Sequence, residues 1–267
     1  MAERHARYFT RLLNATFGGD IEPHRDSGAR NSAEHLGNVR SALAWCFAEA
    51  DAPSKVKLGV ELAAASVPVF LELSLLSECH KWSKDALTSI DHATRGSKCE
   101  LELQEALAIA STWMRGNGDE VRAALTRGLA LATELGEASC RLRLLVGTHV
   151  FLMRIGDFRG SLPIAEHLQA TAHNDADPSY EILSDWMRGS SEHFIGNQTA
   201  ARDHFQKGFA QSWELRTALT LARVRAGQGN REQARQVLAP LYEQFTEGFE
   251  TADLKAAREL LLSLAEA

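Results

Sequence analysis

A helix-ending dipeptide recurs in this chain and constrains its fold more than any other feature. It is a glycine followed by Asp or Asn, and it occurs as Gly118-Asp119, Gly156-Asp157, Gly196-Asn197 and Gly229-Asn230. The steps from one glycine to the next are 38, 40 and 33 residues. Self-similarity at such a period is typical of stacked helical hairpins. We therefore predict an all-α fold, a right-handed superhelix of antiparallel helical hairpins.

The chemistry of the dipeptide explains why it separates helices. A glycine ends a helix in a left-handed conformation without a Cβ clash, and the following Asp or Asn accepts hydrogen bonds from the free N–H groups of the next helix. A small residue stands five positions after each glycine; these residues are Ala123, Ser161, Ala201 and Ala234. Small side chains at these positions predict a close approach between the two helices of each hairpin.

The turn signature divides the chain into two regions. Residues 1–92 read as atypical N-terminal helices and a first hairpin, because the turn between the two helices expected in 55–92 lacks the dipeptide and the first of them is expected to bend or break at Pro68. Residues 93–267 read as regular repeats with a C-terminal capping helix. Helices are expected near 2–17, 99–115, 119–135, 138–155, 157–172, 179–195, 198–211, 212–227, 230–246 and 252–266, with a second helix capped by Ser32 and loops at 18–31 and 173–178.

Composition excludes some classes of function. The net charge of −6 argues against a nucleic-acid-binding surface. The four cysteines never form a Cys-x-x-Cys pair, which favours buried free thiols over a disulfide framework. The first residues are charged rather than apolar, and the most apolar stretch, 62–76, is too short to span a bilayer and contains Glu72. We expect a cytoplasmic protein with no membrane and no direct nucleic-acid partner.

Three stretches carry a resemblance to a known family. They are Glu34-His35-Leu36-Gly37-Asn38-Val39-Arg40-Ser41-Ala42-Leu43-Ala44-Trp45, Arg4-His5-Ala6-Arg7-Tyr8-Phe9, and Ser212-Trp213-Glu214-Leu215-Arg216-Thr217-Ala218 with Phe245-Thr246-Glu247-Gly248-Phe249. In this order they resemble the tetratricopeptide-type helical arm of bacterial signal-transduction ATPases, which are transcriptional regulators with a winged-helix domain and a NACHT-like or AAA-type ATPase. The resemblance implies a tetratricopeptide-like superhelix that acts as the regulatory arm of such an ATPase.

The chain also departs from that family. No phosphate-binding loop of the form Gly-x-x-x-x-Gly-Lys-[Ser/Thr] occurs, and nothing resembles a winged helix. Neither nucleotide binding nor DNA binding is therefore carried over to any residue. The 33-residue step after Gly196 indicates a shortened arm, joined near Ala210 to Ser212.

No cluster of residues predicts catalysis. Glu78-Cys79-His80 holds three metal-ligating side chains, but adjacent residues of a helix point in different directions and do not converge on one ion. His35, His167, His193 and His204 lie in different predicted helices, without a His-x-x-x-His pair. We predict no enzyme, no catalytic residue, no metal and no cofactor.

A binding surface is expected on the first helices of successive hairpins. They carry the aromatic residues Trp113, Phe151, Trp186 and Phe194, which either fill the core between repeats, the favoured interpretation, or anchor a partner on the concave face. The candidate groove residues are Trp113, Arg143, Arg154, Trp186, Arg188 and His193. The arginines at 216, 223, 225, 231 and 235 read as a solvated helix face.

These residues predict a non-enzymatic interaction or sensor module. Its partner would be a protein or peptide, or a small effector. Two alternatives stay open at this point: a stand-alone adaptor that bridges partners without any ATPase, and a foldable gene remnant without a current role.

Overall fold

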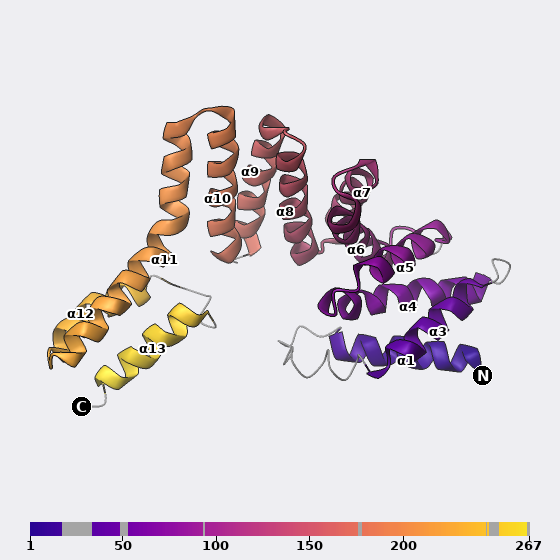
Figure 1. Ribbon diagram of the computed structural model, residues 1–267, viewed down its shortest axis with the longest axis horizontal. Coiled ribbons are helices and arrows are strands. Elements are labelled where there is room, and N and C mark those ends of the chain that lie inside the picture. The colour runs from indigo at the N-terminus through magenta and orange to yellow at the C-terminus, as the bar shows by residue number, and fades with distance from the viewer. Residues whose placement is uncertain are drawn as a thin grey trace. The chain divides into compact units, whose positions relative to one another are not determined.

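The computed structural model describes residues 1–17, 34–48, 53–92, 94–175, 178–243, 245 and 251–265. Within these ranges the chain is helical and contains no strand, so the predicted all-α class is confirmed (Figure 1). The helices are α1 (Ala2–Phe17), α3 (Leu36–Phe47), α4 (Pro53–Glu72), α5 (Leu76–Thr88), α6 (Lys98–Arg115), α7 (Asp119–Leu135), α8 (Ala138–Arg154), α9 (Phe158–Asp175), α10 (Pro178–Ile195), α11 (Gln198–Gly227), α12 (Arg231–Tyr242) and α13 (Ala252–Ala265). The loop expected at 18–31, the Ser32 cap and the motif residues 246–249 lie outside the described residues.

The helices form two compact units, Met1–Ile155 and Gly156–Ala267. In the first unit α4 packs against α1, α3, α5 and α6, and α6 packs against α7 and α8. Its core holds fully buried side chains such as Leu43, Phe70 and Leu103. The boundary that we expect at residues 92/93 separates atypical from regular hairpins rather than compact units, since α5 packs directly against α6 across it. That boundary stays a prediction.

The second unit is organised around α11. This helix packs against α10, α12 and α13, and α9 packs against α10. The helices α11, α12 and α13 share a hydrophobic core, in which Leu215, Leu238 and Leu254 are buried. The apolar positions predicted for the terminal helix pack against this core, namely Leu260, Leu261 and Leu264.

Positive backbone φ angles identify the glycines that end helices. The prediction is confirmed at Gly156, Gly196 and Gly229, whose φ angles are 81°, 100° and 79°. It is wrong at Gly118, which is the N-cap of α7 in an extended conformation with φ −112°. Gly116 ends α6 instead, with φ 80°. The turn contains two glycines, and the first of them takes the conformation that L residues avoid.

Correcting this turn makes the repeat more regular than the sequence indicated. Measured from Gly116, the next step is 40 residues, equal to the step from Gly156 to Gly196. Gly136, with φ 70°, lies midway between Gly116 and Gly156 and ends α7. One helix and its turn therefore occupy 20 residues in this part of the chain.

The predicted caps and small residues are confirmed in part. Asp157 Oδ1 accepts a hydrogen bond from Gly160 N (2.9 Å) and Asn197 Oδ1 accepts one from Ala200 N (3.4 Å). Asp119 is instead the first residue within α7, and the Asn230 side chain makes no cap hydrogen bond. Among the small residues, Ser161, Ala201 and Ala234 are buried, whereas Ala123 is exposed. Counted from Gly116, the equivalent position belongs to Val121, which is buried.

The helices predicted at 198–211 and 212–227 are one helix, α11, of 30 residues. No proline stands near residues 211–212, and no glycine there takes a positive φ. Nothing in the backbone therefore ends the helix at residue 211. The 33-residue step thus spans one long helix where the other steps span two short ones. Figure 1 shows the first half of α11 beside α10 and the second half beside α12.

Other boundaries differ by a few residues. Helix α4 continues through Pro68 without a break, and α9 extends to Asp175, into the loop predicted at 173–178. Helix α12 ends at Tyr242 rather than near residue 246. Ser74 holds a positive φ of 55° in the turn between α4 and α5, the role that glycine has elsewhere.

The two glycines of the first turn give a matched test of this assignment. Gly116→Ser places a side chain where φ is 80° and ψ is −161°, a region that is essentially reserved for glycine. We expect a loss of about 1–3 kcal/mol in the free energy of unfolding. Gly118→Ser adds a favourable N-cap side chain, so its stability should be unchanged or slightly higher. Urea denaturation of both variants measures the difference, and equal losses would contradict the assignment.

The small-residue positions give a second matched pair. Ala201 is 2 % exposed, so Ala201→Trp overpacks the contact of α11 and should cost about 1–3 kcal/mol or more. Ala123 is exposed, so Ala123→Trp should leave the melting temperature nearly unchanged. Thermal unfolding followed by circular dichroism checks both. A melting temperature for Ala201→Trp equal to that of the unchanged protein would show that this position is not a packing contact.

Candidate binding groove

Two neighbouring cavities lie in the Met1–Ile155 unit. The larger, of about 540 Å³, is lined by α1, α4 and α6 together with Arg143 of α8. The smaller, of about 310 Å³, is lined by α6, α7 and α8. Glu105, Ile109 and Arg143 line both. We call the two together the α6 groove, because α6 contributes two of the three residues that they share, Glu105 and Ile109.

The smaller cavity, named here the tryptophan compartment, contains an exposed aromatic side chain beside a cation. Trp113, near the end of α6, is 68 % exposed. The guanidinium carbon of Arg154, the last residue of α8, lies 5.5 Å from the centroid of its ring, within cation–π range. Arg154 makes no hydrogen bond or ion pair with any described residue. Val150 completes the apolar wall and is itself partly exposed.

A bidentate ion pair separates the two compartments. Arg143 Nε donates to Glu105 Oε1 (2.5 Å), and its terminal nitrogen donates to Glu105 Oε2 (2.9 Å). The same terminal nitrogen lies 3.2 Å from Cys140 Sγ. Two parallel charge-assisted bonds hold a guanidinium in a fixed orientation. The middle of the groove is therefore a rigid and nearly neutral element that joins α6 to α8.

The larger cavity, named here the acidic compartment, carries carboxylates without an ion-pair partner. Neither Glu72 nor Glu102 makes a hydrogen bond or salt bridge within the described part of the chain. Burial raises the pKa of the Glu102 carboxyl above its ordinary value, and the charge of Glu105 raises it further, against an opposing influence of Lys98. Phe17 and Leu71 supply apolar wall beside these groups.

The structure brings together one half of the predicted groove residues. Trp113, Arg143 and Arg154 line the same groove, although Arg143 is engaged by Glu105. Sequence reasoning missed Glu72 and Glu102. The spacing of Glu105 and Arg143 was a usable signal, because opposite charges 38 residues apart occupy corresponding helices of adjacent hairpins.

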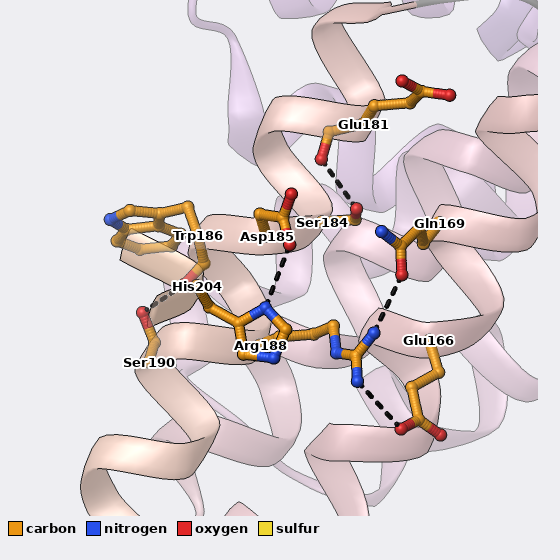
Figure 2. A network of polar contacts seen from close by, with 9 residues as sticks. All are labelled: Glu166, Gln169, Glu181, Ser184, Asp185, Trp186, Arg188, Ser190 and His204. Carbon is orange, nitrogen blue, oxygen red and sulfur yellow. Dashed lines mark hydrogen bonds and ion pairs between the residues drawn. The ribbon is translucent and has the colours of Figure 1, made fainter. Parts of the chain in front are cut away.

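The other half lies on α10 in the second unit. Arg188 donates to Gln169 Oε1 (2.9 Å) and lies 3.5 Å from Glu166 Oε1, while His193 Nδ1 lies 2.8 Å from Gln198 Oε1. Figure 2 shows Arg188 directed toward these two α9 side chains and Trp186 directed away from them. Arg188 and His193 are held in contacts within their own unit, whereas Trp186 is 43 % exposed, and none of the three lines either cavity of the first unit.

The aromatic residues correct the favoured core interpretation. Only Phe151 is buried, at 3 % exposure, with the Arg122 guanidinium 5.0 Å from its ring centroid. Trp113, Trp186 and Phe194 are exposed, so filling the core is wrong for these three. Phe194 instead stacks on Phe158 at the surface, with ring centroids 4.8 Å apart. An exposed tryptophan beside an arginine without an ion-pair partner is a candidate anchor for a binding partner, whereas a buried tryptophan would only contribute to the core.

The adjacent residues Glu78, Cys79 and His80 diverge as expected. Glu78 forms a bidentate pair with Arg40, Cys79 is buried, and His80 Nε2 lies 2.9 Å from Glu120 Oε2. No group of potential metal ligands gathers among the described residues. Cys46, Cys79, Cys99 and Cys140 are free thiols, and burial raises the pKa of Cys46 and of Cys79 to about 11.

The basic residues near α12 are mostly exposed, as predicted for a solvated face. Arg223, Arg231 and Arg235 are exposed, and Arg225 donates to Gln233 Oε1 (3.1 Å). The Arg216 side chain lies outside the described part of the structure.

Glu120 is the centre of a polar cluster that joins α5, α6 and α7. It accepts hydrogen bonds from Lys84 Nζ (2.6 Å) and Ser111 Oγ (2.9 Å), in addition to its contact with His80. Ser111 donates to the carboxylate rather than to the imidazole, so the three groups do not form a nucleophile–base pair. The bonds from Lys84 and His80 lower the pKa of Glu120 to about 2.

This cluster predicts a pH-dependent contribution to stability. A carboxyl whose pKa is near 2 when folded and about 4.3 when unfolded stabilises the fold above pH ~4.3, and this stabilisation is lost as the pH falls toward 2. Because the Glu120 side chain is 28 % exposed, we expect Glu120→Gln to cost a discounted ~1–3 kcal/mol at pH 7. The cost should shrink as the pH approaches 2. Urea denaturation across this pH range measures it.

Glu3→Gln is the matched control, because Glu3 pairs with Arg7 on an exposed face of α1. Exposed pairs of this kind contribute little, so the control should change the free energy of unfolding by less than about 1 kcal/mol at any pH. A Glu120→Gln cost that stays constant from neutral to acid pH would contradict the lowered pKa.

Comparison with known proteins does not assign this chain to a family. A scan against models of protein families finds no match, and a search of curated proteins finds no significant similarity. None of the described helices combines the length and apolar character that crossing a membrane requires. The α6 groove has to be interpreted from its own geometry.

Proposed function

We propose that this protein is a non-enzymatic interaction module that binds a segment of a partner protein in the α6 groove. The observation that carries the proposal is the tryptophan compartment, where an exposed Trp113 ring lies beside an unpaired Arg154. Trp and Arg are the residues most enriched among interface anchors. Covering such a ring removes a large apolar area from water. A partner with a negative charge would in addition form a charge-assisted hydrogen bond with the guanidinium.

We further propose that the hairpins are tetratricopeptide-like and form a right-handed superhelix. Two observations support this proposal. Glycine turns follow one another at 20-residue steps from Gly116 to Gly156. An ion pair also connects corresponding helices of neighbouring hairpins, since Glu105 of α6 and Arg143 of α8 are 38 residues apart, and Arg40 and Glu78 in the N-terminal part pair at the same spacing. Contacts between neighbouring repeats are what stabilises such arrays.

As a biological role we propose the regulatory arm of a signal-transduction ATPase that controls transcription. The resemblance of the segment 34–45 and of the two other motifs supports this proposal. A partner segment in the groove would favour one arrangement of the helices and so shift an attached or associated ATPase between states. The size of such a shift equals the difference in affinity for the two arrangements. A stand-alone adaptor shares the groove and the binding step but has no ATPase to regulate.

Capture of partners by the full chain tests the proposal. The chain and the variant Trp113→Ala/Arg154→Ala are immobilised in parallel, and the retained proteins are identified by mass spectrometry. Losing an anchor pair costs about 2 kcal/mol or more at an interface, so we expect the groove-dependent proteins to fall roughly thirtyfold in the variant. An ATPase with a phosphate-binding loop among them favours the regulatory arm, and its absence favours the adaptor.

Trp186→Ala is the matched control, since Trp186 is also an exposed tryptophan but belongs to the second unit. It should retain the same proteins as the unchanged chain. Because Trp113 is mostly exposed, the groove variant should melt at the normal temperature, which separates lost binding from lost folding. If the groove variant captures the same proteins as the unchanged chain, the α6 groove is not the binding site.

A further inference from the structure

The two ends of the α6 groove carry opposite charges that no hydrogen bond or ion pair within the described chain engages. Glu72 and Glu102 lie in the acidic compartment, and Arg154 lies in the tryptophan compartment. None of the three makes a hydrogen bond or salt bridge with a described residue. The groove is therefore negatively charged in the acidic compartment and positively charged in the tryptophan compartment.

The pair in the middle keeps the two ends distinct. Glu105 and Arg143 line both compartments, but their bidentate contact cancels their charges against each other. The Glu105 side chain is largely buried, at 12 % exposed, whereas the Arg143 side chain is 48 % exposed, so water weakens this pair only from the side of Arg143. A ligand that spans the groove therefore meets a negative end, a neutral centre and a positive end, in that order.

Apolar side chains line the groove between the charged ends. Ile109 belongs to both compartments, Leu71 lies on the acidic side, and Val150 lies on the basic side. This wall gives contact area to an apolar side chain placed between two charged ones. Electrostatic complementarity of this kind fixes the register and direction of a bound chain more than it raises the total affinity.

Glu102 is the group that gains most from an arriving cation. Its partial burial disfavours the charged form and raises the pKa of its carboxyl. An ammonium or guanidinium group beside it would offset that cost, because an opposite charge nearby favours the ionised carboxylate. Glu72 is exposed, lines the same compartment and adds a second negative charge.

We propose that the occupant of the α6 groove is an extended peptide segment with a basic residue at Glu72 and Glu102, an acidic residue at Arg154, and an apolar residue between them. This inference rests on the proposed function and specifies its ligand. The segment binds in one direction only, since reversing it would place like charges together at both ends. Trp113 packs against the part of the segment next to its acidic residue.

Selection from a library of random linear peptides tests the inference. The library is selected on the full chain and depleted on Trp113→Ala, so that the surviving peptides depend on the groove. Their dissociation constants are then measured by fluorescence anisotropy for the unchanged chain, for Glu102→Gln and for Arg154→Gln. Glu3→Gln, on an exposed face of α1, is the control and should leave every constant unchanged.

The expected result is a specific pattern of coupling. Glu102→Gln should weaken binding roughly tenfold, and this loss should vanish when the basic residue of the peptide is replaced by norleucine. Arg154→Gln should weaken binding to a similar degree, and this loss should vanish when the acidic residue is replaced by glutamine. When Glu102→Gln is combined with replacement of the acidic residue of the peptide, or Arg154→Gln with replacement of its basic residue, the two losses should be additive. Added salt should reduce the effects of both protein variants. Glu72→Gln provides a second variant at the acidic end if Glu102→Gln unfolds.

The outcomes separate the two proposals. Peptides that depend on Trp113 but show no coupling, or show coupling in the reversed direction, would overturn the polar ligand while the interaction module stands. If no selected peptide depends on Trp113, the proposed function itself is contradicted.

Discussion

The structure depends on the constraint that a helix must end where a glycine adopts a positive φ. Gly116, Gly136 and Gly156 meet this condition at 20-residue steps, so α6, α7 and α8 have nearly equal lengths. Equal lengths bring corresponding turns of α6 and α8 to the same level, which is why Glu105 and Arg143, 38 residues apart, form a bidentate pair. The geometry of the groove is therefore set by the turns and only then by the side chains that line it.

Much of the fold was predictable because its signals are local. Hydrophobic periodicity and the glycine turns located the helices, most of them to within a few residues of their observed ends. The failures had physical causes. Two glycines share the turn before α7, and sequence alone does not say which of Gly116 and Gly118 carries the positive φ. The helix end expected near residue 211 coincided with the junction inferred before the Ser212 motif, and α11 continues through that point.

The groove was predictable only in part, because it depends on which residues remain exposed and unpaired after packing. Trp113, Arg143 and Arg154 were found from the order of the hairpins, but the aromatic residues were expected to be core. Trp113 lies on the last turn of α6 and is 68 % exposed, although the Arg154 guanidinium lies 5.5 Å from its ring centroid. Glu72 and Glu102 gave no sequence signal, since glutamates on helices usually face water and only the structure shows that these two line one cavity.

A groove with unpaired charges at its ends and a neutral pair at its centre gains specificity rather than raw affinity. An unpaired charge that is partly removed from water costs free energy in the unbound protein, and this applies to Glu102, where burial opposes ionisation, whereas Glu72 and Arg154 are exposed. Packing of the helices does not depend on Arg154 or Glu72, because both residues are exposed. The ligand that we propose would pair with these groups, which gather in two neighbouring cavities and are not needed for packing. A partner of the wrong charge order would leave every one of them unpaired or repelled, and this penalty discriminates between partners.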